Sequence, residues 1–69
     1  MWFTKHAIEK MDTLGIEKDE VIQTLNQGMK WKEKEREVWH AQMAGLEIVF
    51  IKDENDKTII TVYLAHVRK

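Results

Sequence analysis

The first helix is predicted from apolar residues at helical spacing, Ala7, Ile8, Met11 and Leu14. Residues three and four apart share one face of a helix, so these side chains would form a single apolar stripe. Thr4 is a good N-cap, and Phe3 before it can pack on Ile8 as a hydrophobic staple. Gly15 readily takes the left-handed conformation that ends many helices. The pattern therefore predicts a helix from Thr4 to Leu14.

A second short helix is predicted between Glu17 and Gly28. Its apolar residues again fall on one side: Val21, Ile22 and Leu25. Asp19 and Glu20 lie in its first turn, where the helix dipole favours negative charge. Glu17 is a weaker N-cap than serine or aspartate, whereas Gly28 is a typical helix terminator. We therefore expect two short helices ahead of the sheet.

The residues after Arg36 alternate about Ala44-Gly45 as two antiparallel strands would. A two-residue hairpin loop needs positive φ angles, which glycine tolerates. With this loop the predicted cross-strand pairs are Met43 with Leu46, Ala41 with Ile48 and Trp39 with Phe50. The same register ends in two pairs of opposite charge, Glu37 with Lys52 and Arg36 with Asp53. Cross-strand pairs of these kinds contribute roughly 0.2 to 1 kcal/mol each, and a slip by one residue would break both patterns.

A third strand is predicted after a three-residue turn around Glu54-Asn55-Asp56, because Asn and Asp adopt left-handed conformations. Setting Asp53 opposite Lys57 continues the apolar pairing with Phe50 and Ile60, Ile48 and Val62, and Leu46 and Leu64. The predicted fold class is α+β, with two short N-terminal helices packed on one face of a three-stranded antiparallel β-meander. The helices are expected to cover Trp39, Met43, Ile48, Phe50, Ile60 and Val62.

Two interpretations are open for the segment Met29–Glu35, which carries alternating charges. A helix would set like charges four residues apart, as in Lys30 with Lys34 and Lys32 with Arg36, which is unfavourable. An extended segment would put one sign of charge on each side. We favour an extended connector, with a helix through Met43 as the alternative.

The uncovered sheet face is expected to be unusually apolar for a surface in water. Alternation assigns it Val38, His40, Gln42, Glu47, Val49, Ile51, Ile59, Thr61 and Tyr63. An exposed apolar cluster of this kind marks an interface more often than an accident. There are two alternatives: the Met29–Glu35 segment covers these residues, or they are apolar only because such residue types favour β-strands.

Length and charge limit the classes of function. A chain of 69 residues without cysteine or proline forms one domain near the lower size limit for a self-sufficient core, so oligomerisation is expected to help. A missing thiol and the lack of a signal-like or membrane-length apolar run suit a cytoplasmic protein. The net charge of −1 lacks the basic surplus typical of nucleic-acid binding. A segregated basic side is still possible at Lys30, Lys32, Lys34 and Arg36, although mixed charge runs usually serve solvation.

Two stretches of the sequence contain a set of short motifs. The stretch "TKHAIEKMDTLGIEKDEVIQTLNQG" has a His-Ala helix, a Gly-Ile junction and a Glu-Val helix, and "EIVFIKDENDKTIITVY" belongs to a terminal sheet that ends in Thr-Val-Tyr. Together they resemble the domain-of-unknown-function family 4258. His6 and Gly15-Ile16 match the family pattern, whereas the family often has arginine near the positions of Lys10 and Leu14. The resemblance implies a fold similar to small RelE-like toxins of the ribonuclease class, and an origin in bacteria, phages or mobile elements.

The residue types for metal-independent RNA cleavage are present, because such a site needs proton donors and acceptors and a cation for phosphate. His6, His66 and Arg68 are the candidate catalytic residues of this hypothesis, with Tyr63 and Lys69 as further sources. The three histidines, at 6, 40 and 66, have no short ligand spacing, so no metal site and no cofactor are expected. Whether the protein is an enzyme stays open, with the balance towards no.

The favoured hypothesis is a small soluble binding or inhibitor module, encoded by a phage or mobile element and acting as a homo-oligomer. Its partner would be a host protein or a small anionic ligand. The expected contact residues are those of the second sheet face together with a basic and aromatic connector formed by Trp31, Lys32, Lys34 and Arg36. A ribonuclease toxin that uses His6 or His66 with Arg68 is the alternative.

Overall fold

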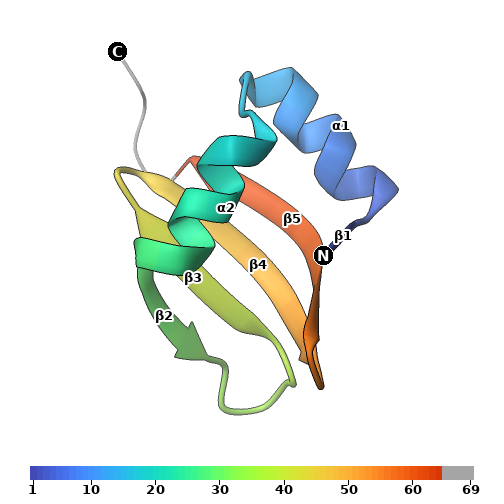
Figure 1. The fold of residues 1–69 in the computed structure, drawn as a ribbon, viewed down its shortest axis with the longest axis vertical. Helices are drawn as coiled ribbons and strands as arrows, with labels where there is room; N and C mark the ends of the chain where they lie inside the picture. Colours follow the sequence, from blue (N-terminus) through green and yellow to red (C-terminus); the bar gives the residue numbers. More distant parts are fainter. Residues whose placement is uncertain (65–69) are drawn as a thin grey trace.

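The computed structural model describes residues 1–64, which form two helices and one five-stranded mixed sheet (Figure 1). In chain order the elements are β1 (Trp2–Phe3), α1 (Lys5–Leu14), α2 (Lys18–Gln27), β2 (Met29–Lys32), β3 (Trp39–Met43), β4 (Leu46–Asp53) and β5 (Asp56–Leu64). The strands lie in the order β1-β5-β4-β3-β2. The α+β class is therefore confirmed.

Both helices begin and end where the sequence predicts. Thr4 caps α1, because its side-chain oxygen accepts a hydrogen bond from the backbone N–H of Ala7. Gly15 follows the helix with φ 71°, a left-handed conformation that favours glycine. At α2 the weak cap Glu17 is reinforced by Glu20 in a capping box.

The prediction of a three-stranded meander is wrong for the sheet as a whole. The antiparallel strands β3, β4 and β5 are extended by β2 on one side and by β1 on the other. β1 pairs parallel to β5, with Trp2 opposite Thr58 and Phe3 opposite Ile59. The extended interpretation of the segment after Gly28 is confirmed over Met29–Lys32, which form β2. A two-residue strand carries too little pattern to be predicted from sequence, and its position depends on a partner more than fifty residues away.

The predicted β3–β4 hairpin is confirmed in its register. Met43 pairs with Leu46, Ala41 with Ile48 and Trp39 with Phe50. Ala44 and Gly45 both have positive φ, 52° and 80°, as the tight turn requires. The predicted charge pairs beyond the hairpin are wrong, because the pairing of β3 with β4 begins at Trp39 and the residues before it form the connection from β2. Glu37 instead pairs with Lys32, and Arg36 with Glu33.

The β4–β5 register departs from the prediction at one point. Leu46 faces Leu64 and Ile48 faces Val62 as expected, but a bulge beyond Val49 sets Phe50 opposite Ile59 rather than Ile60. The bulge inserts one extra residue into β5, so every residue before it changes face. The turn is correspondingly one residue shorter, with Asp53 opposite Asp56 and a positive φ of 45° at Glu54.

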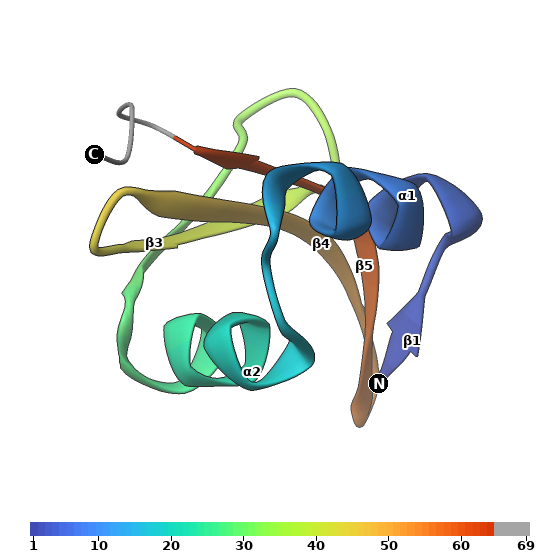
Figure 2. The same ribbon diagram turned by 90° about the horizontal axis from the view of Figure 1, so that it is seen from above.

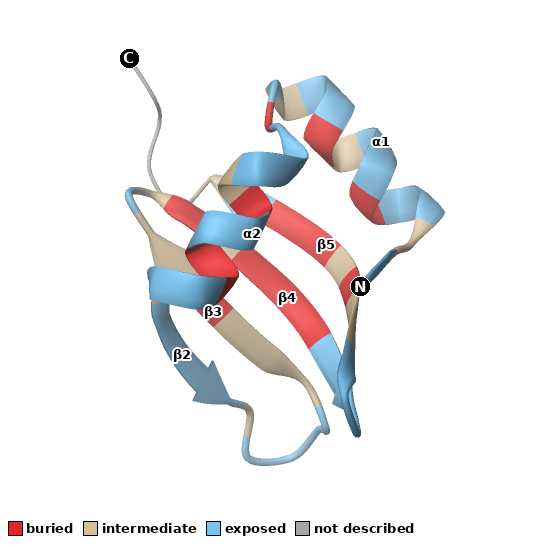
Figure 3. Cartoon of the chain, in the orientation of Figure 1, coloured by how far each residue is buried: buried red, intermediate tan, exposed pale blue. Residues whose placement is uncertain are grey.

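The core lies between α2 and the central strands, with α1 packed along β5 (Figures 1 and 2). Residues that are completely buried include Phe50, Ile48, Ile59 and Val62 of the sheet. Figure 3 shows buried residues side by side over the middle of β4 and along β5. Seen from above, α2 lies on one side of the sheet and the β2–β3 connection rises on the other (Figure 2). The sheet therefore has a second face that α2 does not cover.

Candidate binding surface

The face of the sheet opposite α2, here called the outer face, follows from the register. Its strand residues include Trp31, His40, Glu47, Val49, Ile51, Thr61 and Tyr63. These positions alternate with the core residues Ala41, Ile48 and Val62. One row crosses the sheet through Trp31, His40, Val49 and Thr61, and the next ends at Glu47 and Tyr63.

The outer face carries a charged group over β3 and β4, here called the His40 cluster, of Glu33, Arg36, His40 and Glu47. The Nε2 atom of His40 lies 2.6 Å from Glu33 Oε2, and its Nδ1 atom lies 2.9 Å from Glu47 Oε2. Arg36 binds the same Glu33 carboxylate through two N–H groups, at 2.8 and 2.9 Å. The imidazole is therefore held between two carboxylates that lie on opposite sides of its ring.

Protonation of His40 completes this arrangement. An ionised carboxylate only accepts hydrogen bonds, and only the imidazolium donates from both nitrogens. Partial burial lowers the pKa of His40, but the hydrogen bonds to Glu33 and Glu47 and the negative charges of both carboxylates outweigh that effect and raise it above 6.5. The hydrogen bonds from Arg36 and His40 lower the pKa of Glu33 to about 2. With His40 protonated the cluster contains two positive and two negative groups, and its net charge is zero.

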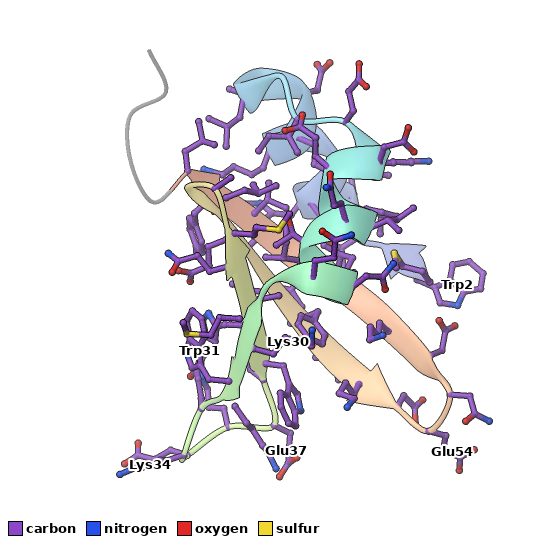
Figure 4. The ribbon with its side chains drawn as sticks, turned by 60° about the vertical axis from the view of Figure 1, so that its left-hand side comes forward. Trp2, Lys30, Trp31, Lys34, Glu37 and Glu54 are labelled. Atoms are coloured by element: carbon purple, nitrogen blue, oxygen red, sulfur yellow. The ribbon has the colours of Figure 1, made fainter. Side chains whose placement is uncertain are left out.

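The β2–β3 loop, residues 33–38, brings Glu33 and Arg36 to the cluster. Gly28 lets β2 start close to β3, because a Cβ at this position would come within 2.8 Å of the Gln42 carbonyl oxygen. Within the loop the Glu33 N–H donates to the Val38 carbonyl oxygen at 2.9 Å. Alternation from Trp31 then directs the Glu33 side chain to the outer face. Lys34 and Glu37 lie at the tip of this loop (Figure 4).

Aromatic side chains lie on either side of the His40 cluster. Trp31 stacks on the His40 ring with the centroids 5.1 Å apart and the planes 4° from parallel. Figure 4 shows Trp31 on β2, at the edge of the sheet. On β5, Tyr63 is 47% exposed and has the Lys10 ammonium 5.7 Å from its ring centroid. The pKa of Arg36 is raised, mainly by the hydrogen bond to Glu33, with a smaller electrostatic contribution from Tyr63.

The predicted contact residues fall into two groups in the structure. His40, Val49, Ile51, Thr61 and Tyr63 lie on the outer face, although Val49 and Thr61 are themselves buried. Val38 lies in the β2–β3 loop before β3 and is half-buried. Ile59 does not lie there, and its assignment to this face is wrong: the bulge turns it into the core, where it is completely buried. The alternative was that residues 29–35 cover this face. The structure agrees with it in part, because Trp31 and Glu33 pack against His40.

The predicted basic side chains do not form one free row. Lys30 Nζ donates to the carbonyl oxygens of Leu25 and Gly28, at 2.9 and 3.3 Å, where it caps the end of α2. Lys32 pairs with Glu37 at 2.9 Å. Lys34 is exposed. Most of the positive charge of the connector is therefore matched by carboxylates or helix carbonyls nearby.

The candidate catalytic residues of the ribonuclease hypothesis are not brought together among residues 1–64. His6 is exposed in the first turn of α1, whereas His66 and Arg68 lie outside the described residues. Within residues 1–64 no group of three His, Cys, Asp or Glu side chains is arranged to hold a metal ion. Each ring nitrogen of His40 is bonded to a different carboxylate, so Glu33 and Glu47 do not meet at one point where a metal ion could bind both of them together with His40. Catalysis by His6 with His66 and Arg68 stays a prediction.

Sequence reasoning placed His40 on the outer face but missed its two carboxylate partners. Glu47 was assigned to the same face, and its position diagonal to His40 in the predicted register was the available signal. Glu33 had no such signal, because its segment was ambiguous between strand and helix. Its contact with His40 depends on where the β2–β3 loop folds.

The fold is that of a small α+β domain with two helices and a five-stranded sheet. The chain belongs to the family described as a domain of unknown function, DUF4258, whose model matches residues 3–64. No curated protein and no solved structure matches the chain. The likeness to RelE-like toxins stays a prediction. Neither helix within residues 1–64 is long and apolar enough to cross a membrane.

Proposed function

We propose that this protein is a binding module that acts on a partner protein through its outer face. The observation that carries the proposal is the presence of Trp31, Arg36 and Tyr63 on this face, with Trp31 and Arg36 held by contacts within the protein. Tryptophan, tyrosine and arginine are the residue types that contribute most to protein interfaces. Fixing them before binding reduces the entropy lost on association.

A protein partner fits this surface better than a small anion. The His40 and Arg36 cations are already bonded to Glu33 and Glu47, so an anion would have to displace a carboxylate from them. A neutral, partly aromatic surface instead resembles the centre of a protein interface, which is depleted in unpaired charge. Ile51, 39% exposed on the same face, adds to its apolar area.

Site-specific crosslinking tests this assignment. A photo-reactive phenylalanine derivative at Tyr63 is expected to capture a defined protein in the cells that express the chain. The same derivative at Ile22, which is 41% exposed on α2, serves as the matched control. Trp31→Ala should reduce the capture at Tyr63. Equal capture from both positions, or from neither, would contradict binding through the outer face.

A second copy of the chain is one such partner, and we propose a homo-oligomer formed through this face. Light scattering after size exclusion should then give more than the monomer mass of 8.2 kDa. Ile51→Glu should dissociate the assembly, because it buries a charge in an apolar contact. Ile22→Glu, an equal change on the opposite side, should leave it intact. A monomer at high micromolar concentration would refute the oligomer and leave a different protein as the partner.

A further inference from the structure

The β2–β3 loop contacts the sheet through the imidazole ring of His40, which can lose a proton. Glu33, the first residue of the loop, contacts His40 Nε2 at 2.6 Å, and Glu47 of β4 contacts Nδ1 at 2.9 Å. A neutral imidazole has one N–H donor and one lone pair. When His40 loses a proton, one of the two carboxylates must therefore face a lone pair instead of a donor.

The geometry indicates which contact is lost. Glu47 lies within β4, where strand pairing on both sides fixes its backbone. Glu33 lies outside the strands and keeps its two hydrogen bonds from Arg36, a residue of the same loop. The Glu33–Arg36 pair is therefore balanced in charge by itself and can leave the ring as a unit. The remaining proton of His40 would stay on Nδ1, facing Glu47.

We propose that His40 is a proton-dependent latch: its protonated ring closes the β2–β3 loop on the outer face, and its neutral ring releases the loop. Release would free Arg36 from its fixed position over the sheet, and Trp31 would lose its stacking on a cationic ring. The closed loop is the form that binds, because it holds both side chains in place. This last consequence, lower affinity at higher pH, rests on the proposed function.

The charged groups around His40 agree with this direction. Glu33 of the loop and Glu47 of β4 contact the ring directly, and Arg36 of the loop is bonded to Glu33. β5 contributes Tyr63 beyond Glu47, with Lys10 of α1 over the tyrosine ring. β2 contributes only the uncharged Trp31 to the contact. Partial burial of the ring lowers the pKa of His40, but the hydrogen bonds to Glu33 and Glu47 and the negative charges of both carboxylates outweigh burial and raise it.

The sign of the pH dependence follows from this raised pKa. A group whose pKa is higher in the closed form than in the open form stabilises the closed form while it is protonated. Closure is therefore complete below the pKa of an open imidazole, near 6.5, and is lost as the pH rises through the higher pKa of His40 in the closed loop. Each unit of difference between the two pKa values corresponds to about a tenfold change in the closing equilibrium.

Nitrogen NMR of the whole labelled chain, titrated from acid to alkaline pH, tests the latch directly. Below the transition both ring nitrogens of His40 should carry protons, and above it only Nδ1. Over the same pH range the Glu33 amide, which bonds to Val38, should lose exchange protection after correction for the intrinsic rate. The expected loss is about tenfold per unit of pKa difference. Protection that does not change while His40 titrates would overturn the proposal, and so would a neutral ring protonated on Nε2.

Variants separate the latch from a general effect of pH. His40→Gln should remove the pH dependence of the loop, whereas His6→Gln, at an exposed position of α1, should leave it unchanged. Glu47→Gln removes one of the two carboxylates and should move the transition to lower pH. It also keeps the test available if His40→Gln does not fold. A transition that stays in place in Glu47→Gln would contradict the assignment of Glu47 as a partner of the ring.

Failure of the latch and failure of the proposed function give different results. Crosslinking from Tyr63 at pH 6 and pH 8 reports on binding, whereas the NMR titration reports on the free protein. A loop that opens in a chain that captures no partner supports the latch and refutes the binding module. Capture that is equal at both pH values, with a loop that stays closed, refutes the latch and leaves the binding module standing.

Discussion

Ile59 and Ile60 are neighbours on β5 with the same side chain and different surroundings. Ile59 is completely buried opposite Phe50, whereas Ile60 is the extra residue of the bulge and is only partly buried. Ile→Val removes one methylene from either residue and keeps the β-branched shape that strands favour. Burial of a methylene stabilises by about 0.8 kcal/mol, and a small cavity raises the cost of losing it to as much as about 1.5 kcal/mol. Ile59→Val should therefore cost about 0.8 to 1.5 kcal/mol, and Ile60→Val less than about half of that.

Urea unfolding followed by circular dichroism measures both costs. We take the free energy of unfolding to fall by roughly 1 kcal/mol per molar urea, near the lower end of the usual range. Ile59→Val should then lower the urea concentration at half-unfolding by roughly 1 M, and Ile60→Val by less than half of that. An unchanged slope in both variants would show that the unfolded state is the same. The regular register without a bulge, with Ile60 opposite Phe50, predicts the opposite order. Equal midpoints, or a larger shift for Ile60→Val, would refute the bulge at this position.

Three further changes test the elements that hold the site in place. Thr4→Ala removes the N-cap of α1 and a hydrogen bond to β5, so thermal melting should show a loss of stability of about 0.5 to 2 kcal/mol. Thr4→Ser keeps the hydroxyl and should lose much less. Gly28→Ala places a Cβ 2.5 Å from the Thr24 carbonyl oxygen, so unfolding by urea should show a loss of about 1 to 3 kcal/mol although its φ of −74° is ordinary. The pKa of Glu33 is lowered to about 2 by the hydrogen bonds from Arg36 and His40, so its stabilising contribution is present above about pH 4.5 and is lost as the pH falls towards 2. Stability measured across that range should fall less steeply in Glu33→Gln than in the natural chain.

The helices and the β3–β4 hairpin could be predicted because their signals are local. Thr4 and Gly15 lie at the ends of an apolar stripe, and Ala44-Gly45 separates two alternating runs of the right length. Each signal lies within a few residues of the structure it specifies, so a single sequence contains enough information. The candidate site was predictable to the same extent: alternation placed His40, Glu47 and Tyr63 on one face of the sheet.

The β4–β5 pairing shows where local patterns stop being sufficient. A bulged and a regular β5 would both place an isoleucine opposite Phe50, because residues 59 and 60 are both isoleucine. The choice between them depends on the fit of one isoleucine beside Phe50 and on the parallel pairing of Phe3 with Ile59. Alternation therefore assigned Ile59 to the outer face, and only the packing of the assembled core places it inside.

By itself, the sequence determined the class of the fold, both helices, the β3–β4 hairpin and the alternation that makes the sheet two-sided. Those features depend on contacts between residues close together in the chain. The tertiary structure decided which strands join the edges of the sheet, where the bulge lies and what surrounds His40. Glu33 and Glu47 reach the two nitrogens of one ring only after β2, β3 and β4 have paired and the β2–β3 loop has folded over them. Charge pairing of this kind depends on distances between separate strands, which residue spacing along the chain does not specify.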